Sequence, residues 1–214
     1  MRRTLITASL LFLATAPLAA QANHDPDKHV AGGGLPAGMM GRADGTAKVT
    51  DVKFAPAGDG YHVTSGPAGI YWSDKNKMSG PFVATITIKQ TKAPTHAEAY
   101  GIFFVGSQLT SPDQTYAYLL VRGDGMVMLN HRAGSDVHKV MPWTANAAVH
   151  KADANGVSTN VLTVDASKPD SVRLKVNGVQ VANYPGSGYG KDNYIGFRVN
   201  HNLDVDVSAI KITH

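Results

Sequence analysis

The stretch SVRLKVNGVQVANYP, residues 171–185, decides the fold class of this 214-residue chain. In its first half, valine and leucine alternate with arginine and lysine, so on an extended strand one face is apolar and the other is charged. Asn177-Gly178 follows, and Val179 and Val181 then resume the apolar face. Asn-Gly between two alternating runs is a strong hairpin signal, because both turn positions need a positive φ. The stretch therefore predicts two antiparallel strands joined by a tight turn.

The same pattern of short apolar runs broken by turn residues continues in both directions. Further runs cover residues 80–91, 98–107, 115–122, 126–132, 158–167, 193–200 and 203–212. Only Glu98 among the 16 acidic residues is a glutamate, and 22 residues are glycine, a composition that suits strands and turns better than helices. We predict about ten to twelve short strands in two packed antiparallel sheets, an all-β sandwich or jelly roll.

The N-terminal residues predict export. Residues 1–22 begin with two arginines, continue with an apolar run and end in Ala-Gln-Ala, the three parts of a secretory signal peptide. We therefore expect a periplasmic or extracellular protein with no membrane span in the mature chain. Residues 23–45 are rich in glycine, proline and aspartate and show no period, which predicts a flexible N-terminal arm. The sandwich domain should then occupy residues 46–214.

Charge and cysteine content exclude several classes of protein. Removing the two leader arginines from the 20 basic residues leaves 18, against 16 acidic residues, so the mature chain is close to neutral. No clustered basic face is visible, and we expect no nucleic-acid partner. The chain has no cysteine, which excludes disulfides and thiol catalysis.

Several blocks resemble one known superfamily. Residues 171–185, with GIYW (69–72), EAYGIFFVGS (98–107), YLLVRGDG (118–125) and IGFRVNHNLDVDVSAIKI (195–212), are similar to strands of concanavalin A-like jelly rolls. That superfamily includes legume lectins, laminin G domains, many glucanases, and secreted bacterial proteins related to keto-glycoside hydrolase-like domains of unknown function. The resemblance covers about residues 48–212. It implies a sandwich whose concave face or rim loops bind carbohydrate or another polymer, in some relatives with a calcium ion.

Glu98 and His96 are candidate catalytic residues. Retaining glucanases of this fold carry two glutamates and an aspartate on one strand, and a chain with a single glutamate lacks that motif. His96 lies two residues before Glu98, so an extended backbone would place both on one face. Together with an aspartate they could act as acid and base, or they could ligate a metal. The alternative is a rim histidine beside a structural carboxylate.

A second set of residues suits sugar recognition, which needs aromatic platforms beside polar side chains. Tyr116, Tyr118, Arg122 and Asn130 could share a face across one hairpin, and Trp143 follows Met-Pro in a predicted loop. Ordinary cross-strand pairing is the alternative for these residues. The candidate ligand-binding residues are Tyr100, Tyr116, Tyr118, Arg122, Asn130, Trp143, Arg198, Asn200 and His201.

The residues after position 197 offer both a binding surface and a possible metal site. Arg198, Asn200 and Asn202 alternate, and on a regular strand they would share one face. Asp204 and Asp206 also share a face, about 6.6 Å apart along the backbone. They are candidate ligands for the calcium that some relatives hold, and the alternative is the solvated face of a strand.

The tripeptide Arg122-Gly123-Asp124 is an adhesion signal for animal cell-surface receptors. The alternating runs on either side of it predict instead the tip of a hairpin, with Gly125 completing the turn. A bacterial-type leader gives no reason to expect such a receptor. Arg122 is the residue of the tripeptide with a possible site role.

Three functions remain open at this stage. The first is a secreted binding module, for carbohydrate or another polymer. The second is a hydrolase acting on glycosides or keto-glycosides through His96, Glu98 and an aspartate. The third is an interaction protein of the cell envelope. We place the binding module first, because the fold suits it and the glucanase glutamates are missing.

Overall fold

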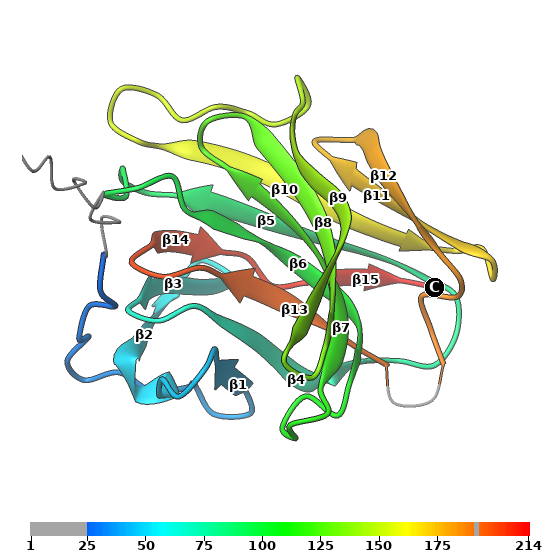
Figure 1. Ribbon diagram of the computed structural model, residues 1–214, viewed down its shortest axis with the longest axis horizontal. Helices are drawn as coiled ribbons and strands as arrows, with labels where there is room; N and C mark the ends of the chain where they lie inside the picture. Colours follow the sequence, from blue (N-terminus) through cyan, green and yellow to red (C-terminus); the bar gives the residue numbers. More distant parts are fainter. Residues whose placement is uncertain (1–24, 191–192) are drawn as a thin grey trace, which may run out of the picture.

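A computed structural model describes residues 25–190 and 193–214 (Figure 1). The chain forms two antiparallel β-sheets with a shared core between them, which confirms the predicted jelly-roll sandwich. The predicted signal peptide, residues 1–22, lies outside the described residues. Within the described ranges, no helix is long and apolar enough to cross a bilayer.

The first sheet has seven strands and carries most of the predicted binding residues. Its strands are, in spatial order, β1 (Met40–Ala43), β4 (Gly69–Met78), β13 (Asn193–Val199), β6 (Ala99–Ser107), β7 (Thr115–Arg122), β8 (Met126–Ala133) and β9 (Asp136–Ala145). β13 lies between β4 and β6, so a late segment of the chain occupies the interior of this sheet (Figure 1).

The second sheet has eight strands. In order they are β12 (Val179–Pro185), β11 (Ser171–Val176), β10 (Ser158–Ala166), β5 (Phe82–Gln90), β14 (Asp204–Val207), β3 (Gly60–Ser65) and β2 (Val52–Ala57), and β15 (Lys211–Thr213) also pairs with β5. A short 3-10 helix, η1 (Val49–Asp51), precedes β2.

The core lies between the two sheets. Ile86 and Ile88 of β5 face Ile102 and Phe104 of β6 and Leu119 of β7, and all five side chains have no exposed surface. Alternate residues of each strand fill this space because side chains of a strand point to opposite faces in turn. Burying each of these side chains stabilises the fold by about 1.5–3 kcal/mol.

The hairpin predicted at residues 171–185 is confirmed. β11 pairs with β12, and Asn177 and Gly178 have φ values of 50° and 84° at the turn. A β-bulge shifts the register next to Leu174 and Lys175. The prediction that Val179 resumes the inward face is wrong: it pairs with Val176 at the exposed tip and is 55% exposed.

Residues 25–45, which belong to the arm predicted at 23–45, contact the sandwich at several points. β1 is part of the seven-stranded sheet. Further upstream, the amide nitrogen of Lys28 donates to Oδ1 of Asn202 at 2.9 Å, and Nδ2 of Asn202 donates to the carbonyl oxygen of Pro26 at 3.0 Å. The segment has no periodic pattern of apolar residues, because hydrogen bonds to residues distant in the sequence, and not an apolar face of its own, hold it against the sandwich.

The outer face of the seven-stranded sheet carries a second apolar cluster. Leu109, in the loop after β6, packs into it, and Arg42 donates to the carbonyl oxygens of Leu109 and Ser111 in that loop. The loop therefore covers part of the face. The buried members are Ile70, Trp72, Ala99, Phe103, Leu109, Tyr116, Tyr118 and Leu120.

The Arg122-Gly123-Asp124 tripeptide is the tip of the β7–β8 hairpin, as predicted. The amide nitrogen of Gly125 donates to the carbonyl oxygen of Arg122 at 3.0 Å, and Gly125 has a φ of 89°. A glycine suits this position because other residues rarely adopt a positive φ.

Candidate functional site

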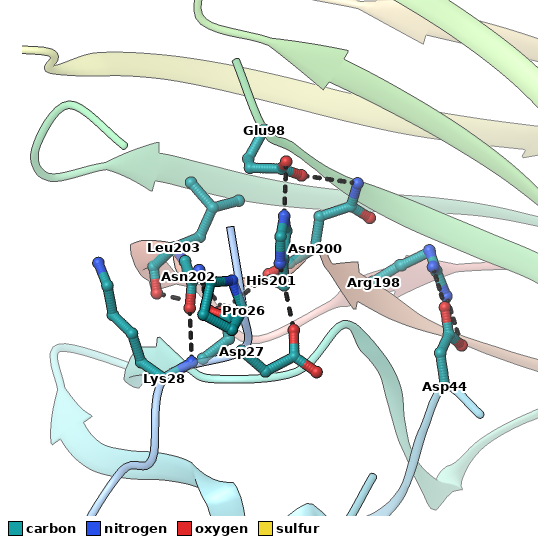
Figure 2. A network of polar contacts seen from close by, with 11 residues as sticks. Pro26, Asp27, Lys28, Asp44, Glu98, Arg198, Asn200, His201, Asn202 and Leu203 are labelled. Atoms are coloured by element: carbon teal, nitrogen blue, oxygen red, sulfur yellow. Dashed lines mark hydrogen bonds and ion pairs between the residues drawn. The ribbon is translucent and has the colours of Figure 1, made fainter. Parts of the chain in front are cut away.

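Arg198 is the centre of the candidate site. It lies on β13, and its side chain is on the outer face of the seven-stranded sheet, 8% exposed. Its guanidinium forms a two-bond ion pair with Asp44, Nη2 to Oδ2 at 2.5 Å and Nη1 to Oδ1 at 3.2 Å (Figure 2). Nη1 also donates to the hydroxyl of Tyr116 at 3.3 Å. A buried cation is thus neutralised by a carboxylate that follows β1.

Burial and charge act in opposite directions on this ion pair. Burial raises the pKa of the Asp44 carboxyl, but Arg198, Arg132 and Arg42 lower it by more, so its net pKa lies below the ordinary value. Burial lowers the pKa of the Arg198 guanidinium, but Asp44 raises it by more, so its net pKa is raised. Both groups therefore stay charged at neutral pH.

Two tyrosines and an asparagine extend the site onto β7 and β8. The ring centroid of Tyr118 lies 5.3 Å from Cζ of Arg198 and 5.4 Å from the ring centroid of Tyr116. Nδ2 of Asn130 donates to the hydroxyl of Tyr118 at 3.3 Å. Burial raises the pKa of the Tyr116 hydroxyl, so this group stays protonated. We call these residues the arginine–tyrosine cluster: Asp44, Tyr116, Tyr118, Asn130 and Arg198.

Two polar atoms of the arginine–tyrosine cluster lack a partner. Within the described residues, Nε of Arg198 and Oδ1 of Asn130 are buried and make no hydrogen bond. A buried polar atom without a partner costs about 1–3 kcal/mol. Water or a ligand can supply such partners, so these atoms mark a place where the face has unused hydrogen-bonding capacity.

A glycine gives Arg198 the space it occupies. Gly101 of β6 lies opposite Arg198 of β13 and opposite Leu120 of β7. A Cβ atom on Gly101 would lie 1.9 Å from the carbonyl oxygen of Leu119, so no side chain fits there. The side chain of Arg198 can therefore reach across β6 toward Tyr116.

Trp143 and Arg122 stand beside this cluster. Trp143 was predicted in a loop, but it lies in β9, where the register against β8 shifts between the pairs Val127–Thr144 and Leu129–Met141. β-Bulges of this kind redirect side chains, and Trp143 packs against the outer-face cluster while remaining partly exposed. Cζ of Arg122 lies 4.4 Å from its ring centroid, and Nη2 of Arg122 pairs with Oδ2 of Asp124 at 2.5 Å.

Glu98 belongs to a second group at one end of the sheet (Figure 2). Its Oε1 lies 2.8 Å from Nε2 of His201, and Nδ1 of His201 lies 3.1 Å from Oδ1 of Asp27. Nδ2 of Asn200 donates to Oε2 of Glu98 at 3.2 Å. His201 therefore bridges the N-terminal segment and the start of β6. We call these four residues the rim network: Asp27, Glu98, Asn200 and His201.

His96 does not form the predicted pair with Glu98. The chain bends at His96, which is exposed, and His201 holds Glu98 instead. The prediction assumed an extended backbone before β6, and this bend is the reason that it is wrong. His96 and Glu98 nevertheless line the same pocket, which has a volume of about 320 Å³.

Arg198, Asn200 and Asn202 do not share one face, which corrects a second prediction. β13 ends at Val199, and Asn202 has a φ of 55° in the turn that follows. Arg198 therefore contacts Asp44 on the sheet face, Asn200 contacts Glu98 at the rim, and Asn202 holds the N-terminal segment.

Tyr100, selected from the sequence as a candidate binding residue, does not lie on the sheet face with the other candidates. It has no exposed surface and lies in the core between the sheets. Its hydroxyl contacts Oγ of Ser158 at 3.2 Å and accepts from Nδ2 of Asn160 at 3.0 Å. Alternate side chains of β6 point to opposite faces, so Tyr100 points into the core between the sheets and Ala99 points to the outer face.

Asp204 and Asp206 share a face of β14, as predicted, but protein groups already hold them. His62 lies between them, with Nδ1 2.8 Å from Asp206 and Nε2 3.4 Å from Asp204. Nζ of Lys92 lies 2.7 Å from Oδ2 of Asp204. An ammonium group at this distance opposes a bound cation, so the pair does not fit a calcium site. Among the described residues, no group of three or more side chains is arranged to hold a metal.

Two acidic residues of the site, Asp27 and Asp44, were not predicted. Both lie in the segment expected to be a flexible arm, where no periodicity indicates a partner. Asp44-Gly45 is a turn signal, and it could have indicated an ordered bend, though not the contact with Arg198.

A larger cavity lies away from these residues. It has a volume of about 500 Å³, and Tyr71, Trp72, Phe197 and Ile212 are among its lining residues. Its lining includes no predicted site residue.

Comparisons with known proteins identify the fold. No protein-family profile matches the sequence, and no curated protein is similar to it. Among solved structures, the chain is similar to the carbohydrate-binding module CBM66 from Bacillus subtilis, with 12% identity and a TM-score of 0.58, over 83% of this chain and 96% of that one.

Two further structures are similar at comparable levels. A family 16 glycoside hydrolase from Bacteroides ovatus, in complex with the product G4G4G3G, has 10% identity and a TM-score of 0.57, over 85% of this chain and 97% of that one. A Bacillus subtilis protein of unknown function with a galectin-like fold has 14% identity and a TM-score of 0.52, over 81% and 88%. At these identities the likeness concerns the fold alone, and this chain is therefore a jelly-roll β-sandwich with a concanavalin A-like fold.

Proposed function

We propose that this protein is an exported carbohydrate-binding module whose ligand lies on the outer face of the seven-stranded sheet. The observation that carries the proposal is the arginine–tyrosine cluster with Trp143 beside it. An aromatic ring next to guanidinium, amide and carboxylate groups is the combination that sugar recognition needs. The unpartnered atoms of Arg198 and Asn130 add hydrogen-bonding capacity at the same place.

The position of Trp143 supports this assignment. Its ring is partly exposed at the outer sheet face, and Arg122 stacks on it. A planar ring held by a guanidinium offers a rigid surface on which a sugar ring can pack at a small cost in conformational entropy. On the same sheet face, toward β13, Tyr118 and Arg198 supply polar groups for sugar hydroxyls.

Two of the structures with a similar fold support the same class of ligand. One is a carbohydrate-binding module, and another is a glycoside hydrolase bound to an oligosaccharide product. Both have the fold of this chain, so a sheet face that carries sugar is compatible with this architecture.

The test is the replacement of Trp143 by alanine. Binding of a soluble oligosaccharide panel is measured by isothermal titration calorimetry, and we expect Trp143→Ala to weaken binding at least about tenfold, since aromatic anchors carry much of the binding energy in a site. Val179→Ala is the control, because Val179 is exposed on the other sheet. Equal affinities of the two variants would argue against the proposed face.

The hydrolase alternative has less support than the binding module. Glycoside hydrolysis needs one carboxyl group to give up a proton and a second to face the sugar. Both carboxylate oxygens of Glu98 are engaged, one with His201 and one with Asn200. These contacts suit a structural role for Glu98, in which it fixes the end of β13 against the start of β6.

Export is part of the proposal and rests on the sequence of residues 1–22. Cell fractionation tests it, with the mature N-terminus determined by mass spectrometry. Cleavage after Ala22 would support the proposed leader, and an intact N-terminus in the cytoplasmic fraction would contradict it.

A further inference from the structure

A pocket of about 320 Å³ lies at the end of the sandwich where four segments meet. They are the end of β5, the connection from β5 to β6, the tip of the β7–β8 hairpin and the loop before β10. Six of its 13 lining residues are alanine or glycine, and these small residues leave space instead of filling it. The volume is at the low end of the range for small-molecule sites, about 300–1,000 Å³, which suits one sugar ring better than a long chain segment.

The floor of the pocket has an acceptor without a partner. Gln90 is 2% exposed, and its Nε2 donates to the carbonyl oxygen of Gly156 at 2.7 Å. That bond fixes the orientation of the amide, because a carbonyl oxygen can only accept. Within the described residues, Oε1 of Gln90 makes no hydrogen bond although it is buried. The pocket therefore has a buried site for a hydrogen-bond donor.

The rim of the pocket is acidic. Glu98, Asp124 and Asp153 line it, and none of its described lining residues is lysine or arginine. Arg122 pairs with Asp124 from the neighbouring sheet face and His201 pairs with Glu98, whereas Asp153 forms no ion pair within the described residues. Both the charge and the floor acceptor favour a ligand that donates hydrogen bonds and carries positive charge.

We infer that this pocket binds the protonated amino group of an amino sugar at the end of the ligand chain. The inference rests on the proposed function and assigns a chemical class to its ligand. Trp143 and the pocket are linked through Arg122, which stacks on Trp143 and pairs with Asp124 on the pocket rim. A sugar chain lying on the outer face can therefore place its last ring at the pocket.

Gly123 offers a way to close the pocket, and a methyl group there requires Cβ of Ala152 to move by a few tenths of an ångström. A Cβ atom there would lie 3.4 Å from both Nε2 and Oε1 of Gln90 and 3.1 Å from Cβ of Ala152. The methyl group of Gly123→Ala would therefore cover the floor acceptor. Gly80→Ala is the matched control, since a Cβ on Gly80 has no atom within 4 Å.

The experiment compares glucosamine oligosaccharides with N-acetylglucosamine oligosaccharides of equal length, at mildly acidic pH, by isothermal titration calorimetry. We expect wild type and Gly80→Ala to bind the glucosamine ligand about tenfold more tightly, because a hydrogen bond to a charged group is stronger than one to a neutral group. In Gly123→Ala this preference should disappear. Urea unfolding verifies that Gly123→Ala and Gly80→Ala are folded.

The outcomes separate this inference from the proposed function. If wild type binds both ligands equally and Gly123→Ala changes neither affinity, the amino-sugar inference is wrong, while a loss of binding in Trp143→Ala would still support the sheet-face site. If no saccharide binds wild type, the proposed function is wrong and the inference falls with it.

Discussion

Two arginine–aspartate pairs of the same form but different burial allow a quantitative test of the candidate site. Arg198 pairs with Asp44 and Arg122 pairs with Asp124, and in each the shorter contact is 2.5 Å. The side chain of Arg198 is 8% exposed and that of Arg122 is 22% exposed. The perturbation is the same in both places: Asp44→Asn and Asp124→Asn, which keep the shape of the side chain and remove its charge.

The expected losses differ because of this burial. Removing one partner of a buried ion pair costs about 3–5 kcal/mol, since the other charge remains buried without compensation. Asp44 is 32% exposed, so solvent reduces this loss, and we expect the free energy of unfolding to fall by about 2–3 kcal/mol in Asp44→Asn. An exposed pair contributes about 0–1 kcal/mol, which is the loss expected for Asp124→Asn.

The assay is urea unfolding at neutral pH, with the midpoint and slope measured for wild type and both variants. Repeating it in acid adds a second check. Because the folded pKa of Asp44 lies below its ordinary value of 3.8, its contribution is complete above that value and is lost as the pH falls below it. The stability difference between wild type and Asp44→Asn should therefore shrink in acid. Equal losses in the two variants at neutral pH would refute the assignment of Arg198 as a buried, neutralised cation.

Three further predictions concern other parts of the chain. Asn202→Ala should release the N-terminal segment, so limited proteolysis should cleave between residues 25 and 30 faster than in wild type; an unchanged cleavage rate would contradict the hydrogen bonds drawn to Asn202 (Figure 2). Burial raises the pKa of Asp165, but bonds from Ser167, Arg173 and Lys175 outweigh it and lower the pKa to about 2. Its stabilisation should be present above 3.8 and disappear as the pH falls toward 2, by about 1–2 kcal/mol, and acid titration of Asp165→Asn should show a smaller change than wild type. Gly101→Ala should destabilise the fold by more than about 3 kcal/mol in thermal or urea unfolding, because its Cβ would overlap the backbone of β7; a stable variant would mean that β6 can move.

Much of the fold could be predicted from local patterns. The alternating runs determine which residues form strands, and Asn177-Gly178 determines a turn, because both depend on neighbours in the sequence. The attachment of residues 25–45 could not be predicted in this way. Asp44 contacts Arg198, which is 154 residues away, and Lys28 contacts Asn202, which is 174 residues away. No local sequence pattern indicates contacts of such long range.

In the candidate site too, contacts within one hairpin could be predicted, whereas contacts between distant segments could not. Tyr116, Tyr118 and Asn130 could be grouped because they face one another across a single hairpin. The pairing of Glu98 with His201 and not with His96 depended on a bend and on the order of strands in the sheet. Tyr100 was selected for its residue type, but its side chain points to the opposite face of β6 from that of Ala99 and is therefore in the core.

The contact between Asp44 and Arg198 has a consequence for the order in which the protein can fold. Its two residues belong to opposite ends of the chain, 154 positions apart, and contacts of such long range form slowly. If the chain is exported N-terminus first, Asp44 reaches the far side of the membrane well before Arg198 does. The arginine–tyrosine cluster can therefore be completed only when almost the whole chain has crossed, and until then the proposed binding face is unfinished.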